Sequence, residues 1–219
     1  MKVALFGCGL IGKRRGEQIG SHKLVGVFDV DAARAEKLAL ELKTVAFKSQ
    51  SDLLYKSDTE IVIVATTNNS LSPVSLAAVN AGKHVLVEKP GAVSLGELEF
   101  LEKTAAQKGV AVKVGFNHRF HPAILKTREL IGQGALGELM FLRARYGHGG
   151  RVGYEKEWRS IPNLGGGGEL LDQGVHLLDL IFWFLGPLPL QSSLVPSSSG
   201  PSKEYFTKGN SEFSFWISM

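Results

Sequence analysis

The sequence has little cysteine, no long hydrophobic run and no strong excess of one charge. Its 219 residues contain one cysteine, so no internal disulfide can form. A single cysteine also excludes a CxxC metal or redox motif, and it predicts a cytoplasmic location. The longest apolar run, Leu180 to Leu185, is far shorter than a bilayer-spanning helix, so no membrane partner is expected.

The charges exclude a further class of partner. Lys and Arg number 25 against 21 Asp and Glu, which gives a net charge of +4. The basic residues are scattered and often lie next to acids, so they do not form the stripe that binds nucleic acid. The length fits one large domain or two small ones, and it is sufficient to bury a core without disulfides or metals.

The first 115 residues alternate between two patterns. Short apolar, largely β-branched runs are typical of strands buried on both faces of a parallel sheet; they cover 2–6, 24–29, 61–65, 84–87 and 110–114. Stretches with helical spacing lie between them, at 32–42, 73–81 and 95–108. This alternation predicts right-handed βαβ units and an α/β fold, a Rossmann-type doubly wound sheet.

The pattern changes after Phe120. A helix is expected over 121–133, a strand over 138–146, a Gly-rich and Arg-rich loop over 147–168 and a strongly apolar helix over 169–185. Residues 1–190 contain nine serines and residues 191–219 nine more. We therefore predict a dinucleotide-binding domain at 1–119, a partial α/β domain at 120–190 and an atypical Ser-rich tail at 191–219.

A glycine motif follows the first predicted strand. Gly7, Gly9 and Gly12 form G-x-G-x-x-G, which allows a tight turn, close approach of a pyrophosphate and close helix packing. Asp29 ends the second strand, where a carboxylate binds ribose hydroxyls and repels a 2′-phosphate, so NAD is favoured over NADP. The alternative is a glycine turn in a non-binding protein. The predicted cofactor residues here are Gly7, Gly9, Leu10, Ile11, Gly12 and Asp29.

Two later strands also end in polar residues. Thr66, Thr67 and Asn68 follow the third apolar run, and they either line the cofactor or form a plain turn. Glu88 and Lys89 end the fourth, at the ligand edge of the sheet. A partly desolvated lysine there suits proton transfer to a substrate hydroxyl, and Pro90 is a candidate for a cis bond that would direct it. The alternative is a solvated Glu–Lys pair.

The late apolar helix carries a polar stripe. Asp172, His176, Asp179 and Trp183 are spaced four, three and four residues apart, so they share one helix face. Polar groups on so apolar a helix must be paired or face a cleft. Two alternatives are a core histidine bonded to Asp172 and a metal cluster, although no second cluster completes a coordination set. The glycines at 165–168 allow close approach to the start of this helix.

Together these motifs resemble the glucose-fructose oxidoreductase, inositol 2-dehydrogenase and MocA (Gfo/Idh/MocA) family of NAD(P)-dependent oxidoreductases. The resemblance covers about residues 1–188. The matching segments are the glycine motif, AGKHVLVEKP at 81–90, GFNHRF at 115–120 and G-G-x-x-x-D-x-G-x-H-x-x-D at 167–179.

The resemblance implies a role for each of these segments. Lys89 corresponds to the lysine near the nicotinamide and the substrate hydroxyl, and His176 to the general acid/base, with Asp172 beside it. Glu88 belongs to the same cofactor-binding motif as Lys89. Substrate contacts are expected from Asn117, Arg119, Tyr154, Trp158, Arg159, Asp172 and His176. Family substrates are mostly sugars, sugar acids, cyclitols and nucleotide sugars, and members form homo-oligomers.

The loop chemistry adds one detail about the substrate. Basic and aromatic residues at 143–159 suit a sugar with an anionic group, such as a nucleotide sugar, although a mixed-charge loop is equally consistent. Family members usually exceed 300 residues, so we expect the second domain to be incomplete and oligomerisation to be doubtful.

The leading function is hydride transfer between nicotinamide and a CH–OH carbon. The alternatives are a truncated, silent NAD-binding module and an NAD-dependent glycoside hydrolase.

Overall fold

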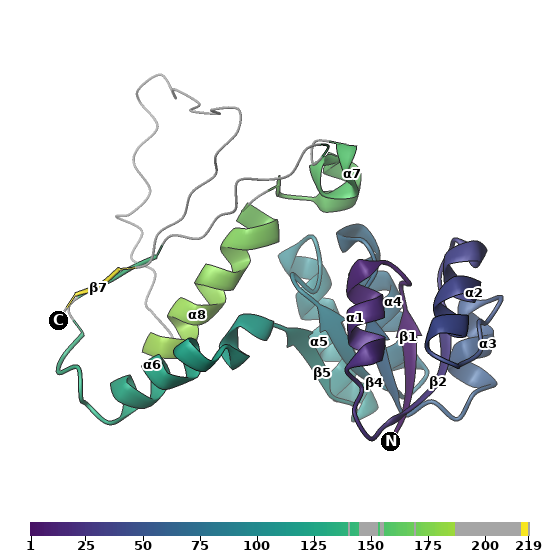
Figure 1. The fold of residues 1–219 in the computed structure, drawn as a ribbon, viewed down its shortest axis with the longest axis horizontal. Helices are drawn as coiled ribbons and strands as arrows, with labels where there is room; N and C mark the ends of the chain where they lie inside the picture. Colours follow the sequence, from purple (N-terminus) through teal and green to yellow (C-terminus); the bar gives the residue numbers. More distant parts are fainter. Residues whose placement is uncertain (140, 145–152, 154–155, 169, 187–215, 219) are drawn as a thin grey trace. The chain divides into compact units, whose positions relative to one another are not determined.

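The computed structural model describes residues 1–139, 141–144, 153, 156–168, 170–186 and 216–218 (Figure 1). The chain forms two compact units. The first contains Met1–Gly115 and Lys156–Asp172, and the second contains Phe116–Glu155 and Gln173–Met219. The first unit therefore takes up a second segment of chain after the second unit has begun. The boundaries at 119 and 190 stay predictions.

The first unit is built on a parallel sheet of five strands in the order β2-β1-β3-β4-β5. This order confirms the predicted doubly wound Rossmann sheet, because the chain crosses over between β2 and β3 and then builds outward. The strands are β1 (Lys2–Phe6), β2 (Lys23–Phe28), β3 (Ile61–Val64), β4 (His84–Glu88) and β5 (Val112–Gly115).

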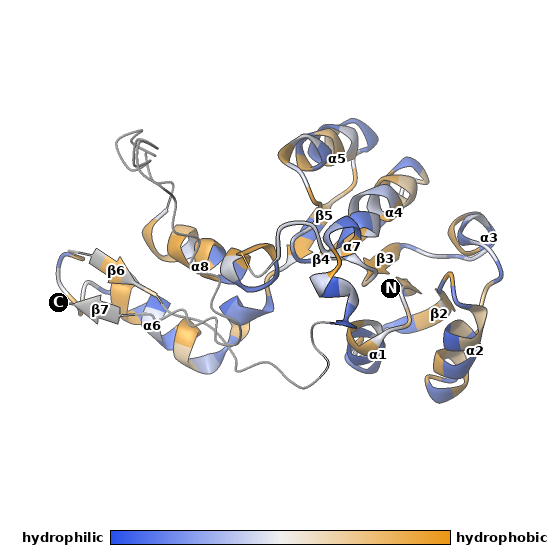
Figure 2. Ribbon diagram, turned by 90° about the horizontal axis from the view of Figure 1, so that it is seen from above, coloured by the Kyte–Doolittle hydropathy of each residue, from blue (hydrophilic) through white to orange (hydrophobic). Residues whose placement is uncertain are grey.

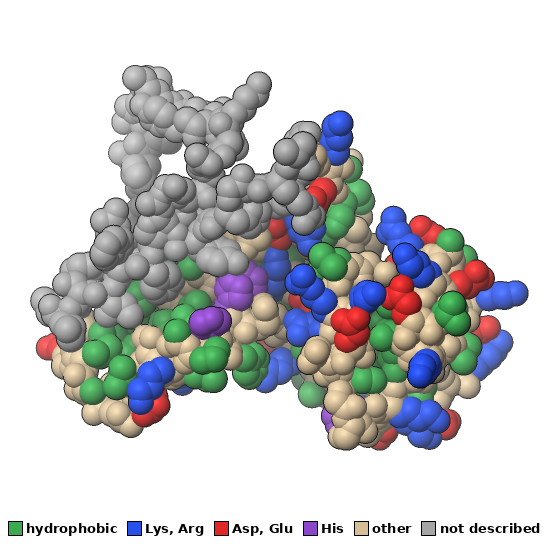
Figure 3. All heavy atoms as spheres, in the orientation of Figure 1, with side chains coloured by type: hydrophobic (Ala, Val, Ile, Leu, Met, Phe, Trp, Pro, Cys, Tyr) green, Lys and Arg blue, Asp and Glu red, His purple; other side chains and the backbone are tan. Residues whose placement is uncertain are grey.

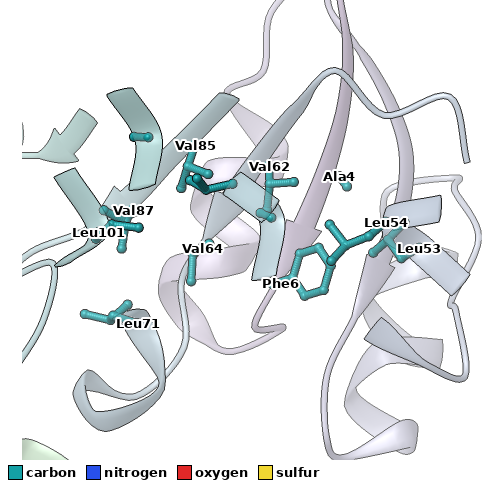
Figure 4. Packing of buried hydrophobic residues seen from close by; sticks show 13 residues of the cluster. Ala4, Phe6, Leu53, Leu54, Val62, Val64, Leu71, Val85, Val87 and Leu101 are labelled. Carbon is teal, nitrogen blue, oxygen red and sulfur yellow. The ribbon is translucent and has the colours of Figure 1, made fainter. Parts of the chain in front are cut away.

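Helices cover both faces of this sheet. They are α1 (Leu10–Glu17), α2 (Ala32–Glu41), α3 (Gln50–Tyr55), α4 (Asn68–Asn80) and α5 (Leu95–Lys108). Alternate strand residues enter two separate cores. Phe6, Val64 and Val87 pack with α3, α4 and α5 (Figure 4), whereas Leu5 and Ile63 pack with α2. Figure 2 shows α2 and α5 with hydrophobic residues along one side and hydrophilic residues along the other.

Local signals account for several helix ends. Asp31, Ser49 and Ser94 cap α2, α3 and α5 by accepting from backbone N–H groups three residues on. Gly109 ends α5 in the left-handed conformation, at φ 65°. The helix predicted over 73–81 starts too late, because Pro73, its expected first residue, lies inside α4. The helix begins at Asn68 and contains Pro73, and the short helix α3 was not predicted.

The second unit has its own helices and a pair of short strands. They are the 3₁₀ turn η1 (Asn117–Phe120), α6 (Pro122–Gly132), α8 (Val175–Leu185) and the antiparallel strands β6 (Phe141–Arg143) and β7 (Trp216–Ser218). Of the strand expected over 138–146, the described residues form β6 at Phe141–Arg143. The predicted helix 169–185 is interrupted, because Leu170–Gly174 forms a π-helical turn before α8.

The returning segment of the first unit is not a continuous loop. It holds the 3₁₀ turn η3 (Trp158–Ser160) and the short helix α7 (Pro162–Gly165). Within the described part of the chain, no helix is both long and apolar enough to span a membrane. On the face drawn in Figure 3, basic and acidic side chains are interspersed over the first unit.

Candidate functional site

The glycine motif forms a tight loop between β1 and α1. Gly7 has a φ of 94°, and a Cβ at this position would collide with the Ala65 carbonyl oxygen. A Cβ on Gly12 would collide with the Gly7 carbonyl oxygen, so the helix packs directly on the loop. A Cβ on Gly9 would meet nothing within 4 Å. Gly7 and Gly12 are therefore required by the fold, whereas Gly9 leaves open space above the loop.

The Asp29 carboxylate is held by the backbone at the end of β2. It accepts hydrogen bonds from the Cys8 N–H at 2.7 Å and from the Asp31 N–H at 2.9 Å, one on each oxygen. Each oxygen retains a lone pair for a further donor.

Burial, with a contribution from the charge of Asp29, raises the pKa of the Cys8 thiol to about 12. Cys8 therefore stays protonated near neutral pH and is no nucleophile.

These features fit a dinucleotide. The start of α1, at Leu10 and Ile11, has no side-chain cap, so its backbone N–H groups are available to a phosphate. Gly9 provides room for close approach, and Asp29 presents two oriented acceptors for ribose hydroxyls. The residues that would hold the adenosine and pyrophosphate portions are thus all in the first unit.

The polar residues after β3 are used differently from one another. Asn68 is buried, and its amide nitrogen donates to the Gly165 carbonyl oxygen at 2.8 Å, which ties α4 to α7. Its amide oxygen remains for a ligand. Thr67 Oγ1 donates to the Asn69 side chain at 2.7 Å, and Thr66 Oγ1 donates to the Thr67 carbonyl at 3.3 Å. Cofactor contacts by these three residues stay predictions.

The most distinctive pair in the first unit joins Lys89 to Asp172. Lys89 Nζ donates to both the backbone carbonyl and Oδ1 of Asp172, across 83 residues of sequence. The Lys89 side chain is 18% exposed and that of Asp172 is 8% exposed. The Lys89–Pro90 peptide bond is cis. Lys89 is therefore not part of a solvated Glu–Lys pair, because its partner is a buried carboxylate.

A second cation lies on the other oxygen of Asp172. Arg159 Nε is 3.5 Å from Asp172 Oδ2, and its guanidinium lies 4.5 Å from the centre of the Trp158 ring. Arg159 Nη1 also approaches Glu157 Oε2 at 3.4 Å. A Cβ on Gly165 would collide with the Arg159 carbonyl oxygen, so the glycine run allows η3 and α7 to pack closely. Asp172 therefore faces two cations.

The second unit holds the predicted histidine. His176 is 4% exposed on α8, and its ring stacks on His118 with centroids 3.8 Å apart and an interplanar angle of 14°. Phe116 meets the same ring edge-on at 6.2 Å. These contacts fix the plane of the His176 imidazole, and His118 was not predicted to take part. Its place in the GFNHRF segment was the only available signal.

Asp179 forms the other ion pair of the late helix. Arg119 is bidentate to it, with Nε 2.7 Å from Oδ2 and Nη2 bonded to Oδ1. This hydrogen bonding raises the pKa of the Arg119 guanidinium further above its ordinary value. Among the described residues no three His, Cys, Asp or Glu side chains are grouped to hold a metal. The acids of the predicted polar stripe bind the chain's own cations instead.

The predicted site residues thus fall into both units. Lys89, Asp172, Trp158 and Arg159 lie in the first, whereas Asn117, Arg119 and His176 lie in the second. Tyr154 and the loop residues Arg145, His148 and Arg151 lie outside the described residues, as do the side chains of Arg143 and the tail 191–215. The sequence did not indicate that Arg15 pairs with Glu88, to whose Oε1 its Nε donates.

Comparison with protein families gives matches over both units. Residues 1–116 match the GFO_IDH_MocA model, described as an oxidoreductase family with an NAD-binding Rossmann fold. Residues 124–201 match the GFO/IDH/MocA C-terminal domain. The first match covers more than half of the chain. It confirms both the family suggested by the sequence motifs and the prediction of an NAD-type cofactor.

Individual relatives agree with these matches. Glucose-6-phosphate 3-dehydrogenase of Bacillus subtilis is 30% identical over 84% of this chain and 53% of its own length. Inositol 2-dehydrogenase of Salmonella paratyphi B is 27% identical, over 92% of this chain and 62% of its own length. The chain therefore spans between about half and two thirds of these relatives.

Solved structures show the same fold. Scyllo-inositol dehydrogenase from Lactobacillus casei, with bound NAD(H) and scyllo-inositol, is 26% identical with a TM-score of 0.76, over 85% of this chain and 56% of that one. GenD2 from gentamicin A biosynthesis, in complex with NAD, is 28% identical, also at 0.76, over 85% and 54%. From its motifs, fold and matches, the chain belongs to the Gfo/Idh/MocA family of oxidoreductases with an NAD-binding Rossmann fold.

Proposed function

We propose that the protein is an NAD-dependent dehydrogenase that oxidises a CH–OH group of a sugar or cyclitol, or reduces the corresponding ketone. The observation that carries this proposal is the buried Lys89–Asp172 pair, which follows β4 in the unit that also holds the glycine loop and Asp29. The C-terminal ends of parallel strands form the ligand edge of such a sheet. The relatives that act on inositols and on glucose 6-phosphate support the substrate class.

The chemistry divides between cofactor and protein. Nicotinamide, when bound, accepts or supplies the hydride. Lys89 donates a hydrogen bond to the substrate oxygen and stabilises the negative charge that develops on it. Asp172 holds the Lys89 ammonium through two acceptors, so the ammonium is oriented before substrate arrives. His176 takes the hydroxyl proton on an imidazole nitrogen during oxidation and returns it during reduction.

Cofactor preference follows from Asp29. Its carboxylate is fixed by two backbone N–H groups, and so it cannot easily turn away from a 2′-phosphate. We therefore propose NAD as the cofactor and NADP as the weaker alternative. Asp29→Ala should weaken NADH binding and narrow the difference between NADH and NADPH. Fluorescence titration of both reduced cofactors measures this, with Asp31→Ala as the matched control for a lost acid.

Substrate choice is proposed to depend on Arg159. Its guanidinium is 25% exposed beside Asp172, and Lys89 adds a second cation to the same carboxylate. Arg159 is shared between Asp172 and Glu157, and its partly exposed guanidinium is the group that we propose to bind a substrate with an anionic group, such as a sugar phosphate or a nucleotide sugar. We also propose a cytoplasmic location, because a chain with one cysteine forms no internal disulfide.

Two measurements test the proposal in order. NADH titration comes first, and a chain that neither quenches nor shifts NADH fluorescence is not a dehydrogenase. Turnover of NAD with inositols, glucose 6-phosphate and nucleotide sugars follows, and Lys89→Ala should abolish it. NADH binding without turnover of any of these substrates would instead favour a silent NAD-binding module. A released aglycone would indicate a glycoside hydrolase.

A further inference from the structure

The Arg15–Glu88 ion pair joins the helix of the glycine loop to the strand that ends before Lys89. Arg15 lies in the last turn of α1, and its Nε donates to Glu88 Oε1 across 73 residues of sequence. The Arg15 side chain is 29% exposed and that of Glu88 is 14% exposed. A pair this poorly hydrated is costly to break, because one charge is then left without a partner.

The strand pattern explains why the two residues meet. Val85 and Val87 of β4 enter the core beside α4 and α5, so Leu86 and Glu88 point to the opposite face of the sheet. Leu86 there packs against the core that contains Leu5. Glu88 is thus directed to the face that carries α1, where Arg15 can reach it.

The neighbouring strand leaves room for the guanidinium. Gly115 ends β5 and is paired with Glu88 in the register of the sheet. A Cβ on Gly115 would lie 3.3 Å from Arg15 Nη2 and 3.4 Å from the Val87 carbonyl oxygen. The absence of a side chain at Gly115 therefore allows Arg15 to lie over the ends of β4 and β5.

The carboxylates of Glu88 and Asp172 consequently hold different cations. Arg15 binds Glu88, and Lys89 binds Asp172. Without Arg15, the poorly hydrated Glu88 carboxylate would need another cation, and Lys89 is adjacent to it in the chain. We propose that Arg15 is a positioning residue, which occupies Glu88 and so keeps the Lys89 ammonium on Asp172. Its catalytic importance rests on the function proposed for Lys89.

Charge-removing variants of the intact chain, without cofactor, test this inference. An amine-acylating reagent is applied briefly, and mass spectrometry gives the rate at Lys89 relative to exposed Lys103. Arg15→Gln should raise the Lys89 rate about threefold or more, the scale of coupling between contacting residues. Arg15→Gln/Glu88→Gln should restore the slow rate, because no unpaired carboxylate then competes for Lys89. Arg14→Gln removes the same charge from the exposed side of α1 and should leave the rate unchanged.

A purely structural role for Arg15 gives different results. The Lys89 rate in the double variant would then be as fast as in Arg15→Gln, or all lysines would react faster together. Either outcome overturns the proposal. So does an equal Lys89 rate in Arg15→Gln and Arg14→Gln. If Arg15→Gln does not fold, Gly115→Ala makes the same comparison, because it crowds the guanidinium without removing it. Cofactor titration is independent of this measurement, so failure of the dehydrogenase proposal is recognised separately.

Discussion

Asp172 and Asp179 lie seven residues apart in the chain, and each holds a cation in a different way. Asp172, in the first unit, accepts from the single ammonium of Lys89 and has Arg159 on its second oxygen. Asp179, in the second unit, uses both oxygens for the guanidinium of Arg119. The two side chains are similarly buried, at 8% and 5% exposure, so burial does not distinguish their roles.

The difference lies in the cations. A lysine ammonium has three donors on a flexible stem, and Lys89 can offer one to a ligand while Asp172 holds the others. The Arg119 fork is fully matched to Asp179, and its guanidinium also lies 5.7 Å from the Trp183 ring centre. A bidentate ion pair of this kind stabilises the fold. Arg119, predicted from the family resemblance to contact substrate, therefore has a clear structural partner, and a substrate role for it remains a prediction.

The largest expected effect is the loss of turnover when Lys89 is replaced. Lys89→Met removes the ammonium that stabilises charge on the substrate oxygen, and kcat should fall by about 10²- to 10⁴-fold. NADH affinity should change little, since the glycine loop and Asp29 are untouched. Stopped-flow turnover and NADH titration separate the two quantities. Lys89→Arg keeps the charge and should still be severely impaired in turnover. Near-normal turnover in either variant would mean that the Lys89–Asp172 pair, like the Arg119–Asp179 pair, is structural.

Loss of Arg119 should instead reduce stability. Arg119→Met leaves the buried Asp179 without its partner, and the free energy of unfolding should fall by about 2 kcal/mol. That is less than for a fully buried pair, because the Arg119 side chain is 35% exposed and partly screened by solvent. Urea unfolding measures it. Lys89→Met is the matched comparison and should cost less, because Arg159 remains on Asp172.

A smaller loss of stability is expected when the positive charge at position 119 is retained. Arg119→Lys cannot form the two parallel hydrogen bonds, and it should lose about 1 kcal/mol of unfolding free energy. Its stability should thus lie between wild type and Arg119→Met in the same urea series. A loss equal to that of Arg119→Met would mean that the fork geometry, rather than the charge, provides all the stabilisation.

The smallest expected effect is that of pH. Asp179 raises the pKa of Arg119, so the stability contributed by this shift is complete below the unfolded pKa of arginine and is lost only above the folded one. Both values lie far above neutral pH. The stability difference between wild type and Arg119→Met should therefore stay constant between about pH 6 and pH 9. A difference that declines within this interval would identify another titrating group as the source.

Local patterns predicted much of the first unit. Continuous β-branched runs such as 61–65 are typical of strands buried on both faces of a sheet, and Gly109 provides a recognisable helix end. The glycine motif and Asp29 were located by spacing, because their positions depend on one strand, one turn and the next strand. Short-range geometry determines all of these features.

The remainder depends on contacts that spacing does not encode. Lys89 and Asp172 are 83 residues apart, and Arg119 and Asp179 are 60 apart. The polar stripe was predicted for a regular helix, but the π-helical turn at Leu170–Gly174 changes the angular relation of Asp172 to the residues that follow. The burial cost of the stripe predicts that its polar groups are paired or face a cleft, and it does not identify the partner of each acid.

The return of Lys156–Asp172 to the first unit has a consequence for how this fold can be divided. A gene fragment that ends at Gly115 encodes the glycine loop, Asp29, Glu88 and Lys89, yet it lacks the carboxylate that Lys89 binds. Recombination at that point would transfer recognition of the dinucleotide without the Lys89 partner. Exchange of the first unit alone between family members therefore requires crossovers after Gly115, before Lys156 and after Asp172, whereas a single crossover after Asp172 carries both of its segments together with 116–155.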